Sequence, residues 1–486
     1  MSAPRSRFAE LTYGQALALV TVAGAVFRLA LLARQQLGID EDFTAAVVSK
    51  PLGEMLGAVG RDSAPPLFYI AEWLVAQAWQ GPAGLRLVPA AAGIALIPLV
   101  AGLARRVAGD SAGLWAAALV AFLPATLLGA ENARMYSAAG AVVVAATLLV
   151  WRALERPSGR RWIAYTSIAA AAIWVDYFSA VALTGVVVAV VWLRPERQRL
   201  MVAILATAAA FASVGPWLLL SASQIAHAGD SFWIPPLSPG SVAGTFGQLF
   251  AGPPVDPGVP GRDALVALQV LAVVAGSMAL VAVAVGWRRL QPEARRATTF
   301  LLVACCGVAA LAAVSIWRPL LEARYAGVMW LPLFALAGVG LASVPRRVAA
   351  AALVALAVPS LALGFTPTHP ETASLLPEIE SRVGADDLVA ADADHYLLLL
   401  GSGDAAVRAR LHIFAAEDPP WYFGTAAYAA GAVIHSVPAS VVADGGSIFW
   451  VADPGAAPPS LPAGYHSLET RCVVLACLDV YGPPGG

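Results

Sequence analysis

The chain has 486 residues, of which 59% are hydrophobic and only 13% are charged, whereas about 25% charged residues is typical of soluble domains. The formal net charge is −1, from 30 basic and 31 acidic residues. This balance excludes chromatin and RNA roles, and the composition predicts a polytopic membrane protein. Lys50 is the only lysine and Asn132 the only asparagine, a bias that indicates a high-GC bacterial genome.

The N-terminal region is expected to form a first transmembrane helix that is not removed as a signal peptide. Arg5 and Arg7 precede an apolar run over about 15–33, and no small-residue cleavage site follows before Asp40. Further runs of spanning length, about 17–25 residues, follow along the chain. The sequence predicts about eleven transmembrane helices, at 12–33, 86–104, 111–130, 136–154, two in a hairpin within 162–193, 200–221, 264–286, 298–316, 326–344 and 348–365.

The distribution of arginines predicts the orientation of these helices. Basic clusters lie in short connections that all fall on one side of the eleven-span arrangement, and such clusters mark the cytoplasmic side. We therefore expect a multi-pass protein of a bacterial plasma membrane with a cytoplasmic N-terminus. The segment 66–80 is expected to lie at the membrane surface as an amphipathic helix. The extracytoplasmic segments are then the loops 34–85, 131–135, 222–263 and 317–325, the turn near residue 176, and everything after residue 366.

The composition changes near residue 366, which predicts a domain boundary. We expect a membrane domain over 1–365 and a small extracytoplasmic α/β domain over 366–486. Short apolar runs between turn-forming residues predict strands in the second domain, at 387–391, 447–452 and 472–481. Cys472 and Cys477 either form a disulfide, which requires a turn between them, or stay free.

Acidic residues follow the first predicted helix. Asp40, Glu41 and Asp42 would stand at the outer membrane boundary, where a carboxylate can act as a general base on a hydroxyl group. The alternative is a solvated acidic loop. A divalent cation is compatible with this cluster, but the sequence supplies no defined ligand set, so no metal ligand is assigned.

The turn 131–135 is unusually polar for a short connection between two spans. It contains Glu131 and Arg134, and Tyr136 follows it directly. A guanidinium at this depth suits bidentate binding of a phosphate. Equally, Arg134 and Glu131 would pair with each other and cap the two helices.

The loop 317–325 carries a second arginine on the outer side. Arg324 and Tyr325 lead directly into the next predicted span. Positive charge on this side runs against the usual bias. Arg324 therefore either binds a lipid-linked phosphate or reaches up to the phosphates of the membrane surface.

Three more outer residues are candidates for substrate contacts. Asp176 is an acid within an apolar hairpin, which makes it a functional candidate unless it simply lies at the surface turn. Trp233 offers either a stacking platform for a sugar or an interfacial anchor. Asp62 precedes the double proline that begins the interfacial helix, a segment that also suits plain anchoring.

Taken in order, these segments resemble the GT-C membrane glycosyltransferases, specifically the family 39 and protein mannosyltransferase-like group. The resemblance covers about residues 10–345. Its motifs are Asp40-Glu41 in the first outer loop, Ala64-Pro65-Pro66-Leu67-Phe68-Tyr69, Leu85-Arg86-Leu87-Val88-Pro89 before the second span, Glu131-Asn132-Ala133-Arg134-Met135-Tyr136 after the third, Arg324-Tyr325 at the start of a late span, and Trp233-Ile234-Pro235-Pro236 as in bacterial members.

The resemblance implies a GT-C fold, a sugar donor linked to polyprenyl phosphate, and inverting transfer to a glycan, lipid or protein of the cell envelope. Asp40 would take the proton of the acceptor hydroxyl while arginines stabilise the leaving phosphate. The implied site has Asp40 and Glu41 as catalytic residues, Arg134, Arg324, Tyr136 and Tyr325 as phosphate ligands, and Glu131, Asp62, Asp176 and Trp233 as substrate contacts.

The sugar and the acceptor are open at this stage. Mannose is the first expectation and arabinofuranose the second, since both are delivered on polyprenyl phosphate in high-GC actinobacteria. Ala64 and Asp176 stand where many members have histidine, so they bear on substrate identity. Two other classes remain as alternatives. The first is a lipid or polysaccharide flippase, which needs polar groups along a path through the bilayer; Arg28 is the only clear charge there. The second is a non-catalytic binding subunit with the same fold.

Overall fold

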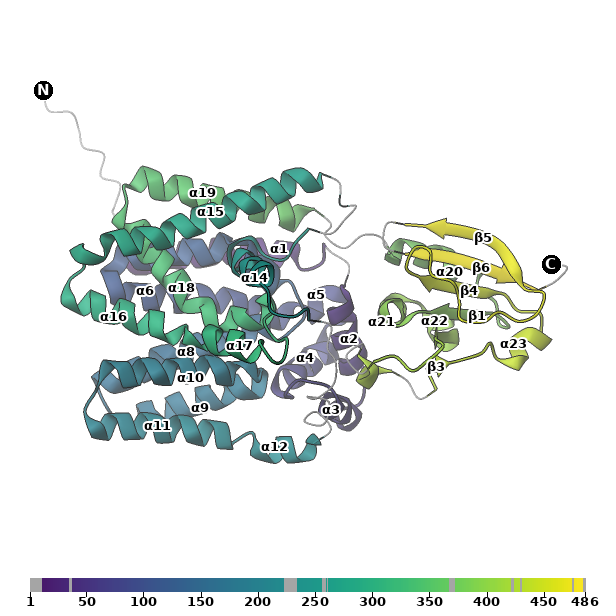
Figure 1. Cartoon of the computed structure of the whole chain (residues 1–486), viewed down its shortest axis with the longest axis horizontal. Coiled ribbons are helices and arrows are strands. Elements are labelled where there is room, and N and C mark those ends of the chain that lie inside the picture. Colours follow the sequence, from purple (N-terminus) through teal and green to yellow (C-terminus); the bar gives the residue numbers. More distant parts are fainter. Residues whose placement is uncertain are drawn as a thin grey trace, which may run out of the picture.

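The computed structural model describes residues 11–34, 37–222, 234–255, 259, 261–366, 372–420, 424–428, 431–473 and 476–483. Long helices form one end of the molecule, and a small sheet flanked by short helices forms the other (Figure 1). The predicted fold class, a helical membrane protein with a small C-terminal α/β part, is therefore confirmed.

Eighteen helices precede residue 366 in the part of the chain that the structure describes. In chain order they are α1 (Tyr13–Leu31), α2 (Ile39–Val48), α3 (Leu52–Arg61), α4 (Leu67–Ala78), α5 (Pro82–Leu85), α6 (Leu87–Phe122), α7 (Pro124–Ala130), α8 (Tyr136–Glu155), α9 (Gly159–Val175), α10 (Phe178–Leu193), α11 (Arg197–Ala212), α12 (Gly215–Leu220), α14 (Pro239–Ala251), α15 (Arg262–Gly286), α16 (Pro292–Ala304), α17 (Cys306–Val314), α18 (Ala323–Ser343) and α19 (Arg346–Phe365).

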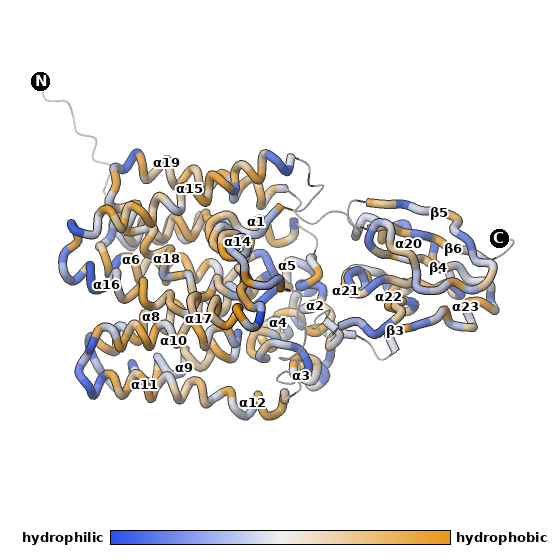
Figure 2. Tube along the Cα trace, in the orientation of Figure 1, coloured by the Kyte–Doolittle hydropathy of each residue, from blue (hydrophilic) through white to orange (hydrophobic). Residues whose placement is uncertain are grey.

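Among the described residues, eight helical segments are long and apolar enough to cross a membrane: α1, α6, α8, α11 with α12, α15, α16 with α17, α18 and α19. Helix α6 has 36 residues and includes non-helical backbone at Ala108 and Gly109, so it contains one predicted span and part of the next. Helices α9 and α10 have 17 and 16 residues and flank Asp176. Figure 2 shows apolar residues along these helices and hydrophilic residues at their ends. The number of crossings, eleven, stays a prediction.

Two segments treated as loops in the sequence analysis contain helices. The segment 34–85 holds α2 to α5, of which only α4 was expected, and 222–263 holds α14. Ser238 caps the start of α14, because its hydroxyl accepts the Ser241 N–H at 3.0 Å, and Pro239 is the first residue of the helix. These are ordinary helix-start signals, but the density of proline and glycine around them obscured the helix.

A six-stranded sheet forms the C-terminal part, in the order β3-β2-β1-β4-β6-β5. The strands β1 to β4 run parallel, and β5 and β6 form an antiparallel hairpin beside β4. The elements are α20 (Leu376–Arg382), β1 (Leu388–Ala391), α21 (Ala393–Ser402), α22 (Ala405–Arg410), β2 (Leu411–Phe414), β3 (Val433–Ile434), α23 (Ala439–Ala443), β4 (Ile448–Ala452), β5 (His466–Cys472) and β6 (Cys477–Gly482).

Two of the three predicted strands match the structure and one does not. The runs 387–391 and 447–452 correspond to β1 and β4. The run 472–481 is not one strand, because β5 ends at Cys472 and β6 begins at Cys477. The two cysteines face each other across the hairpin and form a disulfide. An apolar run does not reveal a turn inside it, which explains this error.

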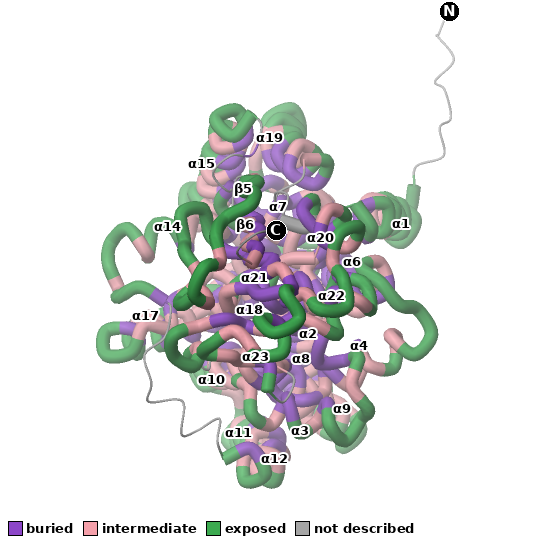
Figure 3. The backbone as a smooth tube through the Cα atoms, turned by 90° about the vertical axis from the view of Figure 1, so that its right-hand side faces the viewer, coloured by how far each residue is buried: buried purple, intermediate pink, exposed green. Residues whose placement is uncertain are grey.

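Close helix packing at the centre of the bundle depends on glycines of α18, the most buried of the eight long apolar segments in the described part of the chain. Seen from the end that carries the sheet, buried residues occupy the middle of the molecule and exposed residues surround them (Figure 3). A Cβ atom at Gly338 would lie 2.5 Å from the Cβ of Ala116 on α6, and one at Gly340 would overlap the carbonyl oxygen of Ala279 on α15. These positions let α18 approach both neighbours closely.

We expect Gly340→Ala to destabilise the protein, because a methyl group there meets backbone that cannot move aside. Overpacking of this kind costs about 1–3 kcal/mol. Thermal unfolding in detergent measures the effect. The control is Gly244→Ala on α14, where a Cβ atom would meet nothing within 4 Å. An unfolding temperature of Gly340→Ala equal to that of the control would contradict this account of the packing.

Candidate active site

Two predicted site residues that are 284 positions apart in the chain form an ion pair. Asp40 lies in the first turn of α2 and Arg324 in the first turn of α18, and the Asp40 Oδ2 atom accepts a hydrogen bond from Arg324 Nη1. The side chains are 35% and 29% exposed, respectively, so both are accessible from outside. The acid expected to act as a base and the arginine expected to bind phosphate are therefore neighbours.

Arg134 lies on the inner side of this pair. Its Nη1 atom donates to the hydroxyl of Tyr69 on α4 at 3.2 Å, and its guanidinium lies 5.5 Å from the ring centroid of Phe43 on α2. No ion pair joins Arg134 to Glu131 among the described residues, so the expected helix-capping pair does not form. Arg134 also interacts electrostatically with Asp40.

The predicted aromatic ligands lie beside the same arginines. The rings of Tyr136 and Tyr325 are 6.3 Å apart, and Tyr325 stacks on Phe178 with 4.4 Å between centroids and an interplanar angle of 11°. Phe178 begins α10, directly after the Asp176 turn. Stacking on Phe178 holds the Tyr325 ring in place, so the hydroxyl is the part of this side chain that can contact a ligand.

Asp62 and Asp176 complete this polar group. Burial raises the pKa of Asp62, and the nearby Arg134 opposes that rise. Burial raises the pKa of Asp176 to about 6, against the hydrogen bond from the Phe178 N–H, at 3.2 Å, and the charge of Arg134. Trp233, the last predicted contact, lies outside the described residues.

Glu41 points away from Asp40 and makes a buried, bidentate ion pair. Its two carboxylate oxygens accept hydrogen bonds from Arg86 Nε at 2.7 Å and Nη2 at 2.6 Å. The same carboxylate accepts the Ala133 N–H at 2.9 Å and the Gly38 N–H at 3.0 Å. Glu41 thus joins α2, the start of α6 and the turn 131–135, and Arg86 is the partner that the sequence analysis left out of the site.

A second, deeper group of acids lies around Arg86. Burial raises the pKa of Glu131 to about 7, although Arg86 and Arg28 lower it. Burial and then Glu41 raise the pKa of Glu72 to about 9, and both Glu72 carboxyl oxygens lack hydrogen-bond partners. Glu131 therefore belongs to this inner layer and not to the Asp40–Arg324 group.

A cavity of about 510 Å³ opens beside Arg324, between α6, α7, α8, α14 and α18. Its polar lining includes Arg324, Glu322, Tyr136 and Asn132. Along α18 the lining continues to Phe334, about 15 Å further at 1.5 Å per residue. Apart from these polar groups the walls are mostly apolar, with Leu96, Leu249, Val328, Leu331 and Trp330 among them.

Asn132 is a site residue that the sequence analysis noticed but did not select. The residue lines the cavity, and its side-chain carbonyl oxygen is buried and has no hydrogen-bond partner in the structure. A buried acceptor without a partner carries a free-energy cost, which a ligand hydroxyl can remove. The sequence does contain a signal for this residue, since it is the single asparagine of the chain and lies in the unusually polar turn 131–135.

The acidic cluster at 40–42 does not gather into a metal site. Glu41 is engaged by Arg86, and Asp42 is fully buried without a hydrogen-bond partner for either oxygen. Within the described ranges, the group of three side chains with metal-ligand spacing lies elsewhere, at Asp392, His395 and Asp453.

The first prediction from this geometry concerns the Arg86–Glu41 pair. Arg86→Met leaves the Glu41 carboxylate buried without its cation, which costs about 3–5 kcal/mol. Adding Glu41→Gln removes the stranded charge and restores much of the stability. Unfolding temperatures in detergent test this. Arg105→Met is the control, because its ion pair with Asp110 is exposed and such pairs contribute about 0–1 kcal/mol. Equal stability of Arg86→Met and the control would refute the prediction.

The second prediction concerns Glu72 and pH. Its pKa rises from an ordinary 4.5 to about 9 in the folded protein. Its stabilising contribution is complete below about pH 4.5 and is lost as the pH rises towards about 9, because the unfolded chain ionises first. We expect Glu72→Gln to flatten this slope and to unfold at a higher temperature than wild type near pH 8. Unfolding temperatures across this pH range give the answer, and parallel curves for the two proteins would count against it.

Comparison with known proteins gives a match to one family model. Residues 62–219, roughly a third of the chain, match the family model described as dolichyl-phosphate-mannose-protein mannosyltransferase. That range includes Asp62, Arg86, Arg134, Tyr136 and Asp176. No curated protein sequence matches the chain.

Solved structures with the same architecture include ArnT from Cupriavidus metallidurans. Its crystal structure bound to undecaprenyl phosphate has a TM-score of 0.62 at 15% identity, covering 96% of this chain and 97% of that one. The apo crystal structure of ArnT has a TM-score of 0.65 at the same identity and coverage. The archaeal oligosaccharyltransferase AglB from Archaeoglobus fulgidus, in complex with an inhibitory peptide and a dolichol-phosphate, has a TM-score of 0.51 at 13% identity, covering 81% of this chain and 64% of that one. The predicted resemblance in fold is thereby confirmed: the chain has the GT-C fold, which it shares with these solved structures.

Proposed function

We propose that the chain is an inverting glycosyltransferase that moves a sugar from a polyprenyl-phosphate donor to a hydroxyl group of a cell-envelope acceptor. The observation that carries this proposal is the ion pair between Asp40 and Arg324, because it sets a potential base beside an arginine that lines the cavity and can bind phosphate. The GT-C fold and the family match over 62–219 support the same reaction class.

The cavity suits the lipid part of such a donor. Its long apolar wall along α18 would hold the first isoprenoid units, and the phosphate would lie at the polar end, beside Arg324 and Tyr136. A guanidinium binds a phosphate more strongly than a neutral donor does. The ArnT crystal structure with undecaprenyl phosphate supports a lipid of this kind.

The ion pair gives donor binding a direct effect on the base. When a phosphate binds Arg324, it competes with Asp40 for the guanidinium and releases the carboxylate towards the acceptor. Asp40 then takes the proton of the acceptor hydroxyl as its oxygen bonds to the anomeric carbon of the sugar. The bond from that carbon to the phosphate oxygen breaks, and the phosphate leaves with its charge stabilised by Arg324 and Arg134.

The other predicted residues have supporting roles in this proposal. Tyr136 and Tyr325 would donate hydrogen bonds to phosphate or sugar, and Asp62 and Asp176 would contact substrate hydroxyls. Asn132 joins them as a proposed substrate contact, because it lines the cavity. Glu41 and Glu131 would position the site from below through Arg86.

Mannose is our first choice of sugar and arabinofuranose the second. The description of the family model that matches 62–219 names mannose, which favours the first. Transfer would take place at the extracytoplasmic face of a bacterial plasma membrane, with the N-terminus in the cytoplasm. The acceptor would be a glycan, lipid or protein of the envelope.

We expect purified protein in lipid to transfer radiolabelled sugar from polyprenyl-phosphate mannose to a cell-envelope extract. Asp40→Asn removes the base, and general-base catalysis contributes about 10²–10⁴-fold, so transfer falls by that factor while donor binding persists. Arg324→Gln weakens both donor binding and transfer. The matched control is Glu54→Gln, an exposed carboxylate on α3.

The same assay separates the competing functions. Donor binding without transfer, from mannose and arabinose donors and with a working control enzyme in the extract, would favour a non-catalytic subunit. Movement of the donor across the bilayer without transfer would favour a flippase. Full activity of Asp40→Asn would assign the base to another carboxylate, and Asp62 would be tested next.

A further inference from the structure

The C-terminal sheet has a topological switch point between β1 and β4. These two strands are parallel neighbours, and the chain continues from β1 to β2 on the opposite side of β1. The connections therefore leave β1 and β4 in opposite directions. In open parallel sheets, the crevice outside the carboxyl ends of two such strands is where ligands bind.

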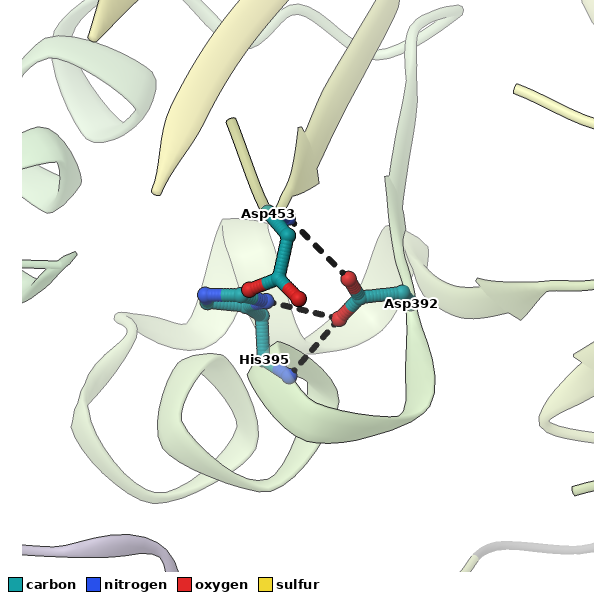
Figure 4. A group of neighbouring side chains, drawn as sticks. All are labelled: Asp392, His395 and Asp453. Atoms are coloured by element: carbon teal, nitrogen blue, oxygen red, sulfur yellow. Dashed lines mark hydrogen bonds and ion pairs between the residues drawn. The ribbon is translucent and has the colours of Figure 1, made fainter. Parts of the chain in front are cut away.

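Three side chains that can bind metal ions meet at this position. Asp392 is the residue after β1, Asp453 is the residue after β4, and His395 lies in the first turn of α21. A ligand atom of each lies within 4.8 Å of the others, and Figure 4 shows the two carboxylates and the imidazole gathered at the strand ends.

The hydrogen bonds of Asp392 orient the group but leave ligand positions available. Its Oδ1 atom accepts the His395 N–H at 3.0 Å and lies 2.6 Å from His395 Nδ1, and its Oδ2 atom accepts the Asp453 N–H at 3.2 Å. Each carboxylate oxygen has two lone pairs, so one lone pair of Oδ2 remains available to bind a metal ion. The His395 Nδ1 atom faces Asp392, so an ion bound by both residues would replace the contact between Nδ1 and Oδ1.

The electrostatics of the crevice favour a cation. His395 is 93% buried, since 7% of its surface is exposed, whereas Asp453 is exposed. Across the described part of the chain, the Asp453 carboxylate has no hydrogen bond or ion pair. A third carboxyl, Asp394, stands beside the group.

We propose that Asp392, His395 and Asp453 bind one divalent transition-metal ion, with water or an anionic group in the remaining coordination positions. Two carboxylates and one imidazole form a mixed oxygen and nitrogen set, which suits Zn²⁺ or Mn²⁺ better than the all-oxygen sites that Ca²⁺ and Mg²⁺ prefer. The Asp392 carboxylate caps the positive end of α21, which would offset the unfavourable helix dipole for a cation bound there.

The site connects to the membrane part through α21. This helix has ten residues and begins at the proposed ion. Near its other end, a Cβ atom at Gly401 would lie 2.8 Å from the Oδ1 atom of Asp42 on α2, the helix that carries Asp40. An ion at the first turn would therefore fix one end of the helix whose other end packs against the catalytic helix.

The test is a calorimetric titration of the full-length, chelator-treated protein in detergent with Zn²⁺ alone. We expect saturable binding of about one ion per chain, and Asp453→Asn should weaken it about tenfold or more. Asp453 is exposed, so this variant is expected to fold normally. The matched control is Asp418→Asn, because Asp418 is also exposed and lies 3.5 Å from a histidine, His435, in the same domain.

Each outcome decides the proposal, and none involves a sugar donor, so the result is independent of glycosyl transfer. Binding that is unchanged in Asp453→Asn, equally weakened in Asp418→Asn, or not saturable in wild type overturns it. A second measurement identifies the nitrogen ligand. Electron spin-echo spectra of bound Mn²⁺ should show an imidazole nitrogen in wild type and lose it in His395→Gln, and an identical signal in that variant would exclude His395.

Discussion

The buried ion pair between Arg86 and Glu41 is the interaction on which the outer half of the molecule depends. It ties α2 to the start of α6, and through the Ala133 N–H it also fixes the turn 131–135. Arg86 Nη1 further donates to the Leu32 carbonyl at 3.1 Å, at the end of α1. Two charges removed from water require good geometry and full hydrogen bonding to be tolerated, and this pair has both. The direction in which Asp40 points follows from it, because Asp40 and Glu41 are adjacent on a helix and project to different sides.

The candidate site is therefore built in two layers. The inner layer, around Arg86, contains acids whose pKa is raised by burial, such as Glu72 and Glu131. The outer layer contains Asp40, Arg324 and Arg134, the residues that we propose contact the substrates. A layer that holds position and a layer that meets substrate need different environments: the first must be dry for its ion pair to be strong, and the second must admit a ligand.

Sequence reasoning located the outer layer well, because acids and arginines in short outer segments of an apolar chain are conspicuous. It placed Asp40, Arg134, Arg324, Tyr136 and Tyr325 in separate segments and expected them to meet, and the structure brings them together. It gave Glu41 and Asp40 the same role, because the sequence does not show which of two adjacent acids has a partner such as Arg86. It also missed α14, and it left the turn between Cys472 and Cys477 as one of two alternatives, since helix caps and turns within apolar or proline-rich runs give weak local signals. The metal-ligand group at Asp392 was equally hidden, because its members are close only once β1 and β4 pair.

The distance along the chain between Asp40 and Arg324 has a consequence for biosynthesis. The acid is among the first residues made, whereas the arginine follows 284 residues later. Until α18 is made, Asp40 therefore lacks this cation. The cavity is likewise incomplete until α18 packs against α6, because residues of both helices line it. A nascent or truncated chain that ends before α18 contains the candidate base but no assembled site. In the proposed function, transfer therefore requires the complete set of helices through α18.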